Sequence, residues 1–211
     1  RLGRGSYANF SQGFQPPEVG ELYRGVKVPV LEPASFNNYE VGGWLAFADG
    51  RMYLEASYYM MKGNNEIITV RFDDGSFGNA NARKTTHRGI EYAVTFQPSS
   101  AVAISLGGTN ATHHFAAQIE SGNDYSGNEM NGSPDWIANA GITVRPSFLK
   151  GSRINVEWQH IGAFFLDPAN SAEYGGYDIF NVRLAYDFGG IEVWWNIMKV
   201  PDEQFPPLAP K

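Results

Sequence analysis

The feature that most limits what this chain can fold into is a period-2 alternation of apolar and polar side chains over segments of about ten residues. In the segment 152–164, one face carries Ile154 and Val156, and the other carries Arg153 and Glu157. Such alternation is typical of β-strands with one apolar face. The predicted strands are residues 6–14, 39–48, 51–61, 86–96, 101–112, 136–145, 152–164, 177–188 and 191–198. The sequence therefore predicts an all-β fold with about nine strands.

The connections between these strands alternate between long and short. The short ones, at 48–51, 97–100, 146–151 and 189–190, carry the Gly, Pro, Asp or Ser residues of tight turns. Outer-membrane barrels have this asymmetry, and their strands of ~9–11 residues match the predicted lengths. The pattern favours an antiparallel up-and-down transmembrane β-barrel. A soluble β-sandwich or lipocalin-like binding module remains the alternative, because its strands also alternate.

Three polar residues interrupt the apolar face, and all lie toward the long-loop ends of their strands: Gln12, His160 and Asp178. A polar side chain costs little where the bilayer gives way to headgroups, whereas Arg or Lys at the midplane costs about 2–4 kcal/mol. The position of these exceptions favours a bilayer around the apolar face.

Composition excludes several classes of protein. No apolar run among the 211 residues reaches the ~18–20 residues of a transmembrane helix. The absence of Cys excludes disulfides and thiolate metal sites. A net charge of −6 with scattered basic residues argues against nucleic-acid binding. Residues 1–4 lead directly into a strand without a signal peptide, so we expect the chain to start inside a fold.

Several sequence pieces, in this order, resemble TonB-dependent outer-membrane receptors. They are YANFSQGFQPPEVGELY from Tyr7, LEP from Leu31 with YEVG from Tyr39, NARKTTHRGIEY from Asn81, SPDWIANAGITVRP from Ser133, DPAN from Asp167 with YGGYDIFNVRLAYDF, and WWNIMKVPDEQF from Trp194. The resemblance implies a segment of a 22-stranded barrel without its N-terminal plug, in the bacterial outer membrane. We expect residues 1–198 to form part of the C-terminal half of that barrel. Residues 199–211 would be a divergent tail, because their prolines cannot form a sheet strand.

The same resemblance implies a receptor that takes up a scarce nutrient, which in this family is most often a ferric siderophore and is so predicted here. The residues themselves do not distinguish a ferric siderophore from cobalamin, haem or an oligosaccharide. Its expected partners are outer-membrane lipid and lipopolysaccharide, the plug of the complete protein, TonB and the small-molecule ligand. No cofactor, metal or nucleic acid is expected.

The sequence shows no pattern of catalytic residues, and we therefore predict that the chain is not an enzyme. His113 and His114 are adjacent on a strand end and point to opposite faces, so they do not predict a metal site. Residues 73–75 lack the ligand pattern of a calcium loop and instead predict a hairpin turn after residues 67–72. The inward-facing carboxylates are interpreted as solvated or paired wall charges, with Arg153 and Arg183 as partners. They are Glu40, Glu55, Glu91, Glu157 and Glu192.

Two further sets of residues are predicted from position alone. Candidate ligand-binding residues lie in the long connections: Arg71, His113, His114, Tyr125, Asp167 and Tyr174. Candidate membrane-interface aromatics lie near strand ends or on the apolar face: Tyr39, Tyr58, Trp136, Trp158, Phe188 and Trp195.

Overall fold

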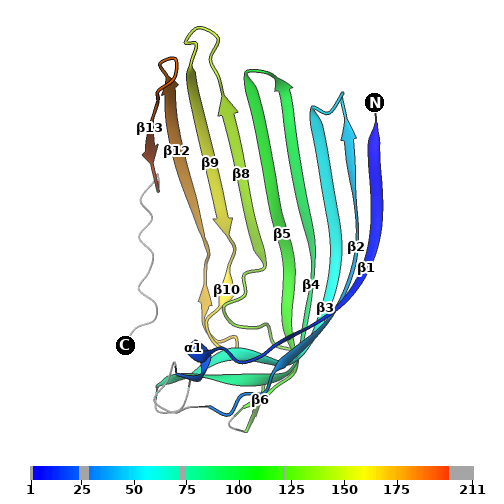
Figure 1. The fold of residues 1–211 in the computed structure, drawn as a ribbon. Coiled ribbons are helices and arrows are strands. Elements are labelled where there is room, and N and C mark those ends of the chain that lie inside the picture. Colours follow the sequence, from blue (N-terminus) through cyan, green and yellow to red (C-terminus); the bar gives the residue numbers. More distant parts are fainter. Residues whose placement is uncertain (1, 24–28, 72–74, 121, 200–211) are drawn as a thin grey trace.

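The computed structural model consists mainly of one antiparallel nine-stranded sheet (Figure 1). The structure describes residues 2–23, 29–71, 75–120 and 122–199. The sheet strands, in spatial order, are β1 (Gly3–Gln15), β2 (Ala34–Phe47), β3 (Met52–Arg71), β4 (Phe77–Ser99), β5 (Val102–Ala117), β8 (Trp136–Val144), β9 (Ser152–Ile161), β12 (Tyr177–Asp187) and β13 (Glu192–Ile197). Each strand of the sheet pairs with the sheet strand that follows it in sequence, which is the predicted up-and-down order.

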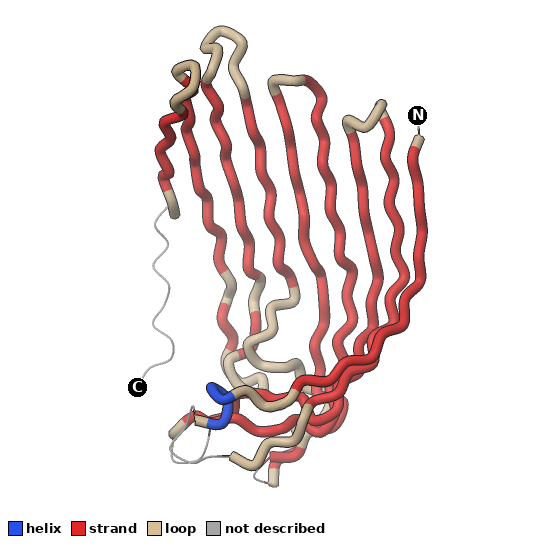
Figure 2. The backbone as a smooth tube through the Cα atoms, in the orientation of Figure 1, coloured by secondary structure: helices blue, strands red, loops and turns tan. Residues whose placement is uncertain are grey.

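The connections confirm the predicted asymmetry. Tight turns join β2 to β3, β4 to β5, β8 to β9 and β12 to β13 at one end of the sheet, here called the turn end (Figure 2). In the first of them, Ala48, Asp49 and Gly50 all have positive φ, which Asp and Gly tolerate best. The longer connections lie at the other end, here called the loop end.

The prediction was wrong about the connection after Met61. β3 and β4 continue as a paired hairpin as far as Arg71 and Phe77, instead of giving way to a loop. The hairpin predicted after residues 67–72 is confirmed, while residues 72–74 lie outside the described part. At about 3.3 Å per residue, the 20 residues of β3 extend about 65 Å, twice the ~30 Å hydrocarbon core of a bilayer. The hairpin must therefore project beyond any membrane that the sheet crosses.

The register gives the sheet two chemically distinct faces. Along one row across the strands, Leu54, Val94, Leu106, Trp158 and Phe180 lie on the same side, here called the outer face. The polar residues between them lie on the inner face. Large apolar side chains of the outer face are exposed, Phe180 by 38%, because no second layer of the described chain packs on them.

The hydrophobic core cluster lies at the loop end, where β3, β4 and β5 extend beyond the shorter strands of the sheet. It consists of Ile68, Val70, Ala82, Phe115 and Met130, contributed by β3, β4, β5 and the connection after β5. Phe115 pairs with Thr85 and continues the inner-face series of β5, so the core forms on the inner side. We call this core and the connections around it the loop cap.

Smaller elements complete the loop cap. The helix α1 (Val19–Leu22) follows β1, and short hairpins pair β6 (Ile119–Glu120) with β7 (Asn123–Asp124) and β10 (Phe164–Phe165) with β11 (Glu173–Tyr174). Glu21 accepts a hydrogen bond from the Glu18 backbone N–H at 2.8 Å, which begins the helix. No helix among the described residues is long and apolar enough to cross a membrane.

Candidate functional site

The inner face carries the five predicted carboxylates, and the structure gives several of them partners. The Tyr7 hydroxyl donates to Glu40 at 2.5 Å, and the Tyr53 hydroxyl donates to Glu55 at 3.1 Å. Gly42 leaves room for the first contact, because a Cβ there would lie 2.7 Å from the Tyr7 hydroxyl oxygen. Both contacts are hydrogen bonds between side chains of the wall, and neither pairs a carboxylate with a basic side chain.

The ion pair predicted for this wall is present between Arg153 and Glu192, whose side-chain atoms lie 2.6 Å apart. The pair reaches across β12, because Arg153 is directly opposite Ala185 and Glu192 opposite Asp187. The small side chain of Ala185 is only 6% exposed beneath it. Arg183 instead donates to the Asn196 side-chain oxygen at 2.8 Å. Both arginines therefore serve to fasten the edge strand β13.

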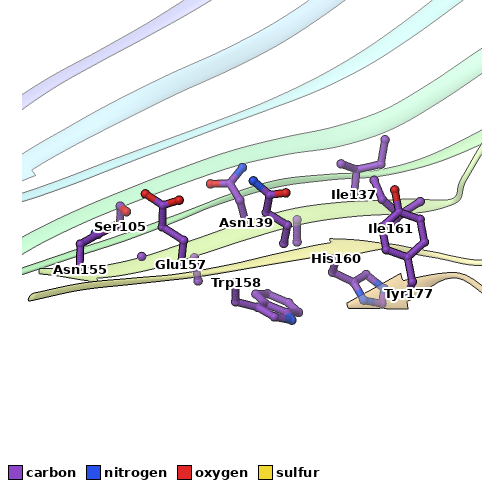
Figure 3. A pocket seen from close by; sticks show the side chains of 13 residues that line it. Ser105, Ile137, Asn139, Asn155, Glu157, Trp158, His160, Ile161 and Tyr177 are labelled. Atoms are coloured by element: carbon purple, nitrogen blue, oxygen red, sulfur yellow. The ribbon is translucent and has the colours of Figure 1, made fainter. Parts of the chain in front are cut away.

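Two recesses lie along the sheet, and polar groups of the inner face line part of each. One, of about 410 Å³, is formed by β5, β8, β9 and the start of β12. Figure 3 shows Asn139, Asn155 and Glu157 on one side of the strands and Trp158 and His160 on the other. The other, of about 420 Å³, is lined by the residues Tyr7, Glu55, Ser57, Glu91, Tyr92, Ala93, Gly108, Thr109, Ile137 and Asn139. Amide and carboxylate groups predominate among the polar atoms of both, so the wall can hydrogen-bond a polar occupant.

Asp167, a candidate ligand residue, organises a turn in the loop cap. Its carboxylate accepts hydrogen bonds from the backbone N–H groups of Ser171 and Ala172 and from the Ser171 hydroxyl, at 2.9–3.2 Å. Burial alone would raise the pKa of Asp167, but these hydrogen bonds outweigh it and lower that pKa below the usual value. The turn also presents Asn170, whose amide exchanges two 2.9 Å hydrogen bonds with the backbone of Glu129. The contact joins two connections of the cap.

The two candidate tyrosines are partly packed. Tyr125 lies against the hydrophobic core of the cap. The ring centroid of Tyr174 lies 5.1 Å from that of Phe164 in a tilted contact, and 6.3 Å from that of Tyr177 in an edge-to-face contact. Arg71 ends β3, and its side chain lies outside the described part. Among the candidates whose side chains are described, no hydrogen bond or ring contact joins Tyr125, Asp167 and Tyr174 to one another, so a ligand role for them stays a prediction.

The two candidate histidines do point to opposite faces, as their adjacency predicts. His113 lies opposite His87 on the inner face, where their Nδ1 atoms are 2.8 Å apart. His114 lies opposite Thr86, and its backbone bridges to that of Glu129. Among the described residues, no group of three or more acidic, His or Cys side chains is arranged to hold a metal ion.

His113 belongs to a chain of hydrogen bonds that sequence reasoning missed. The Nε2 atom of His87 lies 2.8 Å from Oε2 of Glu66, and the Thr85 hydroxyl donates to the same oxygen at 2.5 Å. We call Thr85, Glu66, His87 and His113 the histidine chain. Strict alternation would place Glu66 on the outer face, but Asn65 has a φ of +55° and reverses the direction of the strand's side chains. The only sequence signal is the Asn itself, which tolerates this conformation.

Five of the six predicted interface aromatics fall on outer-face positions of the register: Tyr39, Tyr58, Trp136, Trp158 and Trp195. Phe188 follows the end of β12, and its ring centroid lies 4.6 Å from that of Tyr186. Trp158 and Trp136 meet at the loop end with ring centroids 6.1 Å apart, and the Trp158 indole donates to Asp178 at 2.7 Å. His160 also contacts Asp178, at 2.9 Å. Two of the polar residues that interrupt the apolar face thus satisfy each other. A bilayer-interface role for the aromatics stays a prediction.

Comparison with known proteins decides the family. Residues 4–198 match the family described as TonB dependent receptor-like, β-barrel. The chain belongs to the TonB-dependent receptors. Accordingly, its sheet is part of the wall of a β-barrel in the bacterial outer membrane, and the outer face is the lipid side of that wall.

Relatives and solved structures agree with this family. The chain is 22% identical over 188 residues to the ferrichrome outer membrane transporter/phage receptor of Escherichia coli K12, covering 88% of this chain and 24% of the relative. It is similar to the siderophore receptor PiuA of Acinetobacter baumannii, with TM-score 0.71 and 19% identity, covering 95% of this chain and 30% of PiuA. It is also similar to the ferric yersiniabactin uptake receptor FyuA of Yersinia pestis, with TM-score 0.72 and 16% identity, covering 95% of this chain and 30% of FyuA. The chain therefore spans about a quarter to a third of the length of these proteins.

Proposed function

We propose that this chain is part of the barrel wall of a receptor that takes up a scarce nutrient, specifically a ferric siderophore, across the outer membrane. The observation that carries the proposal is the family match over residues 4–198. The names of similar proteins, a ferrichrome transporter and two siderophore or ferric-siderophore receptors, support the choice of substrate class. The complete receptor would also require a plug and TonB to supply energy for release of the ligand.

The architecture supports separate roles for the barrel wall and the loop cap. The wall offers amide and carboxylate groups on its inner face, where a plug or a passing ligand would lie, and an apolar outer face toward lipid. The loop cap has its own hydrophobic core and can hold binding residues at the external mouth. The matching family is one of receptors and the curated relative is a transporter, so we propose transport and not catalysis.

The soluble alternative is not supported. A β-sandwich or lipocalin-like module needs its apolar face covered by a second sheet or closed inside a barrel. In the described chain the apolar face of the nine-stranded sheet is exposed, with Ile90 51% and Phe10 55% accessible. The order in which the strands pair, and the register that collects apolar side chains on one face, instead fit the wall of a barrel that contacts lipid.

The proposal is tested by growth of a strain that lacks the complete receptor and is complemented with it under iron limitation. A panel of ferric siderophores, with ferric citrate, haem and cobalamin as comparators, identifies the substrate. The proposal expects siderophore-dependent growth that disappears in a strain without TonB. Growth restored only by haem or cobalamin would contradict the substrate class, and growth without TonB would contradict the mechanism.

A further inference from the structure

The histidine chain connects three strands at the base of the loop cap. Glu66 comes from β3, His87 and Thr85 from β4, and His113 from β5. His87 is 5% exposed and Thr85 1% exposed, so water has little access to the contacts. The site is tightly built, because a side chain at Gly63 would collide with the Thr85 hydroxyl and lie 3.1 Å from Glu66 Oε2.

The number of protons that this chain can hold follows from its donors and acceptors. The Glu66 carboxylate can only accept, so His87 Nε2 must carry a proton. The 2.8 Å contact between the Nδ1 atoms of His87 and His113 then needs one proton shared between two nitrogens. It forms when both rings are neutral, or when one is neutral and the other cationic. When both rings are cationic, both Nδ1 atoms carry protons and the hydrogen bond is lost.

The surroundings favour the form with at least one neutral ring. Burial and the positive charge of His87 lower the pKa of His113 below its usual value. The pKa of Glu66 would be raised by its burial, but hydrogen bonds from His87 and Thr85 lower it on balance. Other titratable groups on the described elements packed nearby are His114 on β5, Tyr59 and Lys62 on β3, Arg83, Lys84 and Arg88 on β4, and Glu32 and Glu129 in the connections. Lys62 and Arg88 occupy outer-face positions of the register, away from the histidine chain. The β2 residues that face the chain from the inner side, Phe36 and Asn38, carry no charge.

We propose that the histidine chain is a pH-sensitive latch that holds the β3–β4 hairpin of the loop cap to β5 at neutral pH and loosens it when both imidazoles are protonated. Since the pKa of His113 is lowered in the closed cap, the open cap binds more protons than the closed cap below about pH 6.5. Closure therefore weakens as the pH falls through this window, while Glu66 remains ionised. The biological meaning of the latch rests on the proposed receptor function, because it regulates the external mouth of that receptor.

Hydrogen–deuterium exchange of the complete receptor in detergent tests the latch without any substrate. Amide protection of residues 66–82, corrected for the intrinsic rate, is compared at pH 7.5 and 5.5. Loss of one hydrogen bond predicts a fall of about 2- to 10-fold at pH 5.5, which His113→Gln should abolish. The matched control His160→Gln, on the outer face, should keep the full pH dependence. A wild-type cap with pH-independent protection, or a His113→Gln cap that keeps the dependence, would overturn the latch.

A second measurement needs no variant. Exchange of the imidazole C2 hydrogen reports the pKa of each histidine in the wild-type protein. The latch requires His113 to titrate below the ordinary value of about 6.5, and a value at or above it would refute the proposal. Failure of either measurement leaves the transport assay unaffected, so the latch and the receptor function fail independently.

Discussion

Replacing Phe115 with Ala should open the loop cap while leaving the barrel wall intact. Phe115 is completely buried and packs with Ile68, Val70, Ala82 and Met130. Deleting a buried Phe side chain typically costs about 3–5 kcal/mol, as lost transfer energy plus a cavity. Only the loop-end extensions of β3, β4 and β5 contribute to this core, and the rest of the wall does not, so the loss should fall on local closure of the cap.

Limited proteolysis of the complete receptor measures this effect. Since 1.4 kcal/mol corresponds to a factor of ten, cleavage within the cap should accelerate by about 10² to 4 × 10³-fold if it proceeds through local opening. The temperature at which the barrel unfolds in detergent should change little. Phe10→Ala, on the exposed outer face, serves as the control and should not alter cap cleavage. Cap cleavage within about threefold of wild type would refute the assignment of an independent core.

Three further predictions concern single positions. Asn65→Val should loosen the hairpin by about 1–2 kcal/mol, because a β-branched residue is strained at φ +55°, whereas Asn65→Gly should be tolerated; exchange of the hairpin amides distinguishes them. The lowered pKa of Asp167 means that its turn is stabilised above the ordinary pKa near 3.9 and weakens as pH falls through the lower folded value; Asp167→Asn should remove this dependence, measured as protection of residues 168–172. Glu192→Gln should cost at most about 1 kcal/mol in barrel stability, because Arg153 and Glu192 are 40% and 45% exposed; a larger loss of denaturant resistance would show that the pair does more than fasten an edge.

The wall of the barrel could be predicted from sequence because its determinants are local. Period-2 alternation identifies a strand wherever lipid and water lie on opposite faces, and Gly50, Pro98 and Gly189 mark turns that need little tertiary context. The number of strands and their order were confirmed on this basis. The carboxylates of the inner face, such as Glu91, followed from the same alternation.

The loop cap could not be predicted in the same way, because tertiary contacts decide it. The predicted strands stop at Met61 and start again at Thr86, whereas β3 and β4 continue beyond these residues as a hairpin. The alternation is lost in that hairpin because one side of it is buried in the cap. The left-handed Asn65 reversed the facing of Glu66, so the contact with His87 was invisible to a periodic pattern. The candidate ligand-binding residues were chosen only because they lie in the long connections. That position does not tell whether their side chains come together to form one site. The predicted boundary of a divergent tail at 199 stays a prediction, and residues 200–211 lie outside the described part.

The measurement that tests the account most directly compares two adjacent residues of β12 in the complete receptor. Val182 lies in mid-strand on the outer face, opposite Val156, and Asn181 lies on the inner face, opposite Glu157. Arg facing lipid near the midplane costs about 2–4 kcal/mol, so Val182→Arg should reduce the amount of heat-modifiable, folded barrel in outer-membrane fractions. Asn181→Arg should assemble normally, because its side chain reaches the aqueous interior. Normal assembly of Val182→Arg together with failure of Asn181→Arg would contradict the claim that the apolar face of this sheet contacts the membrane.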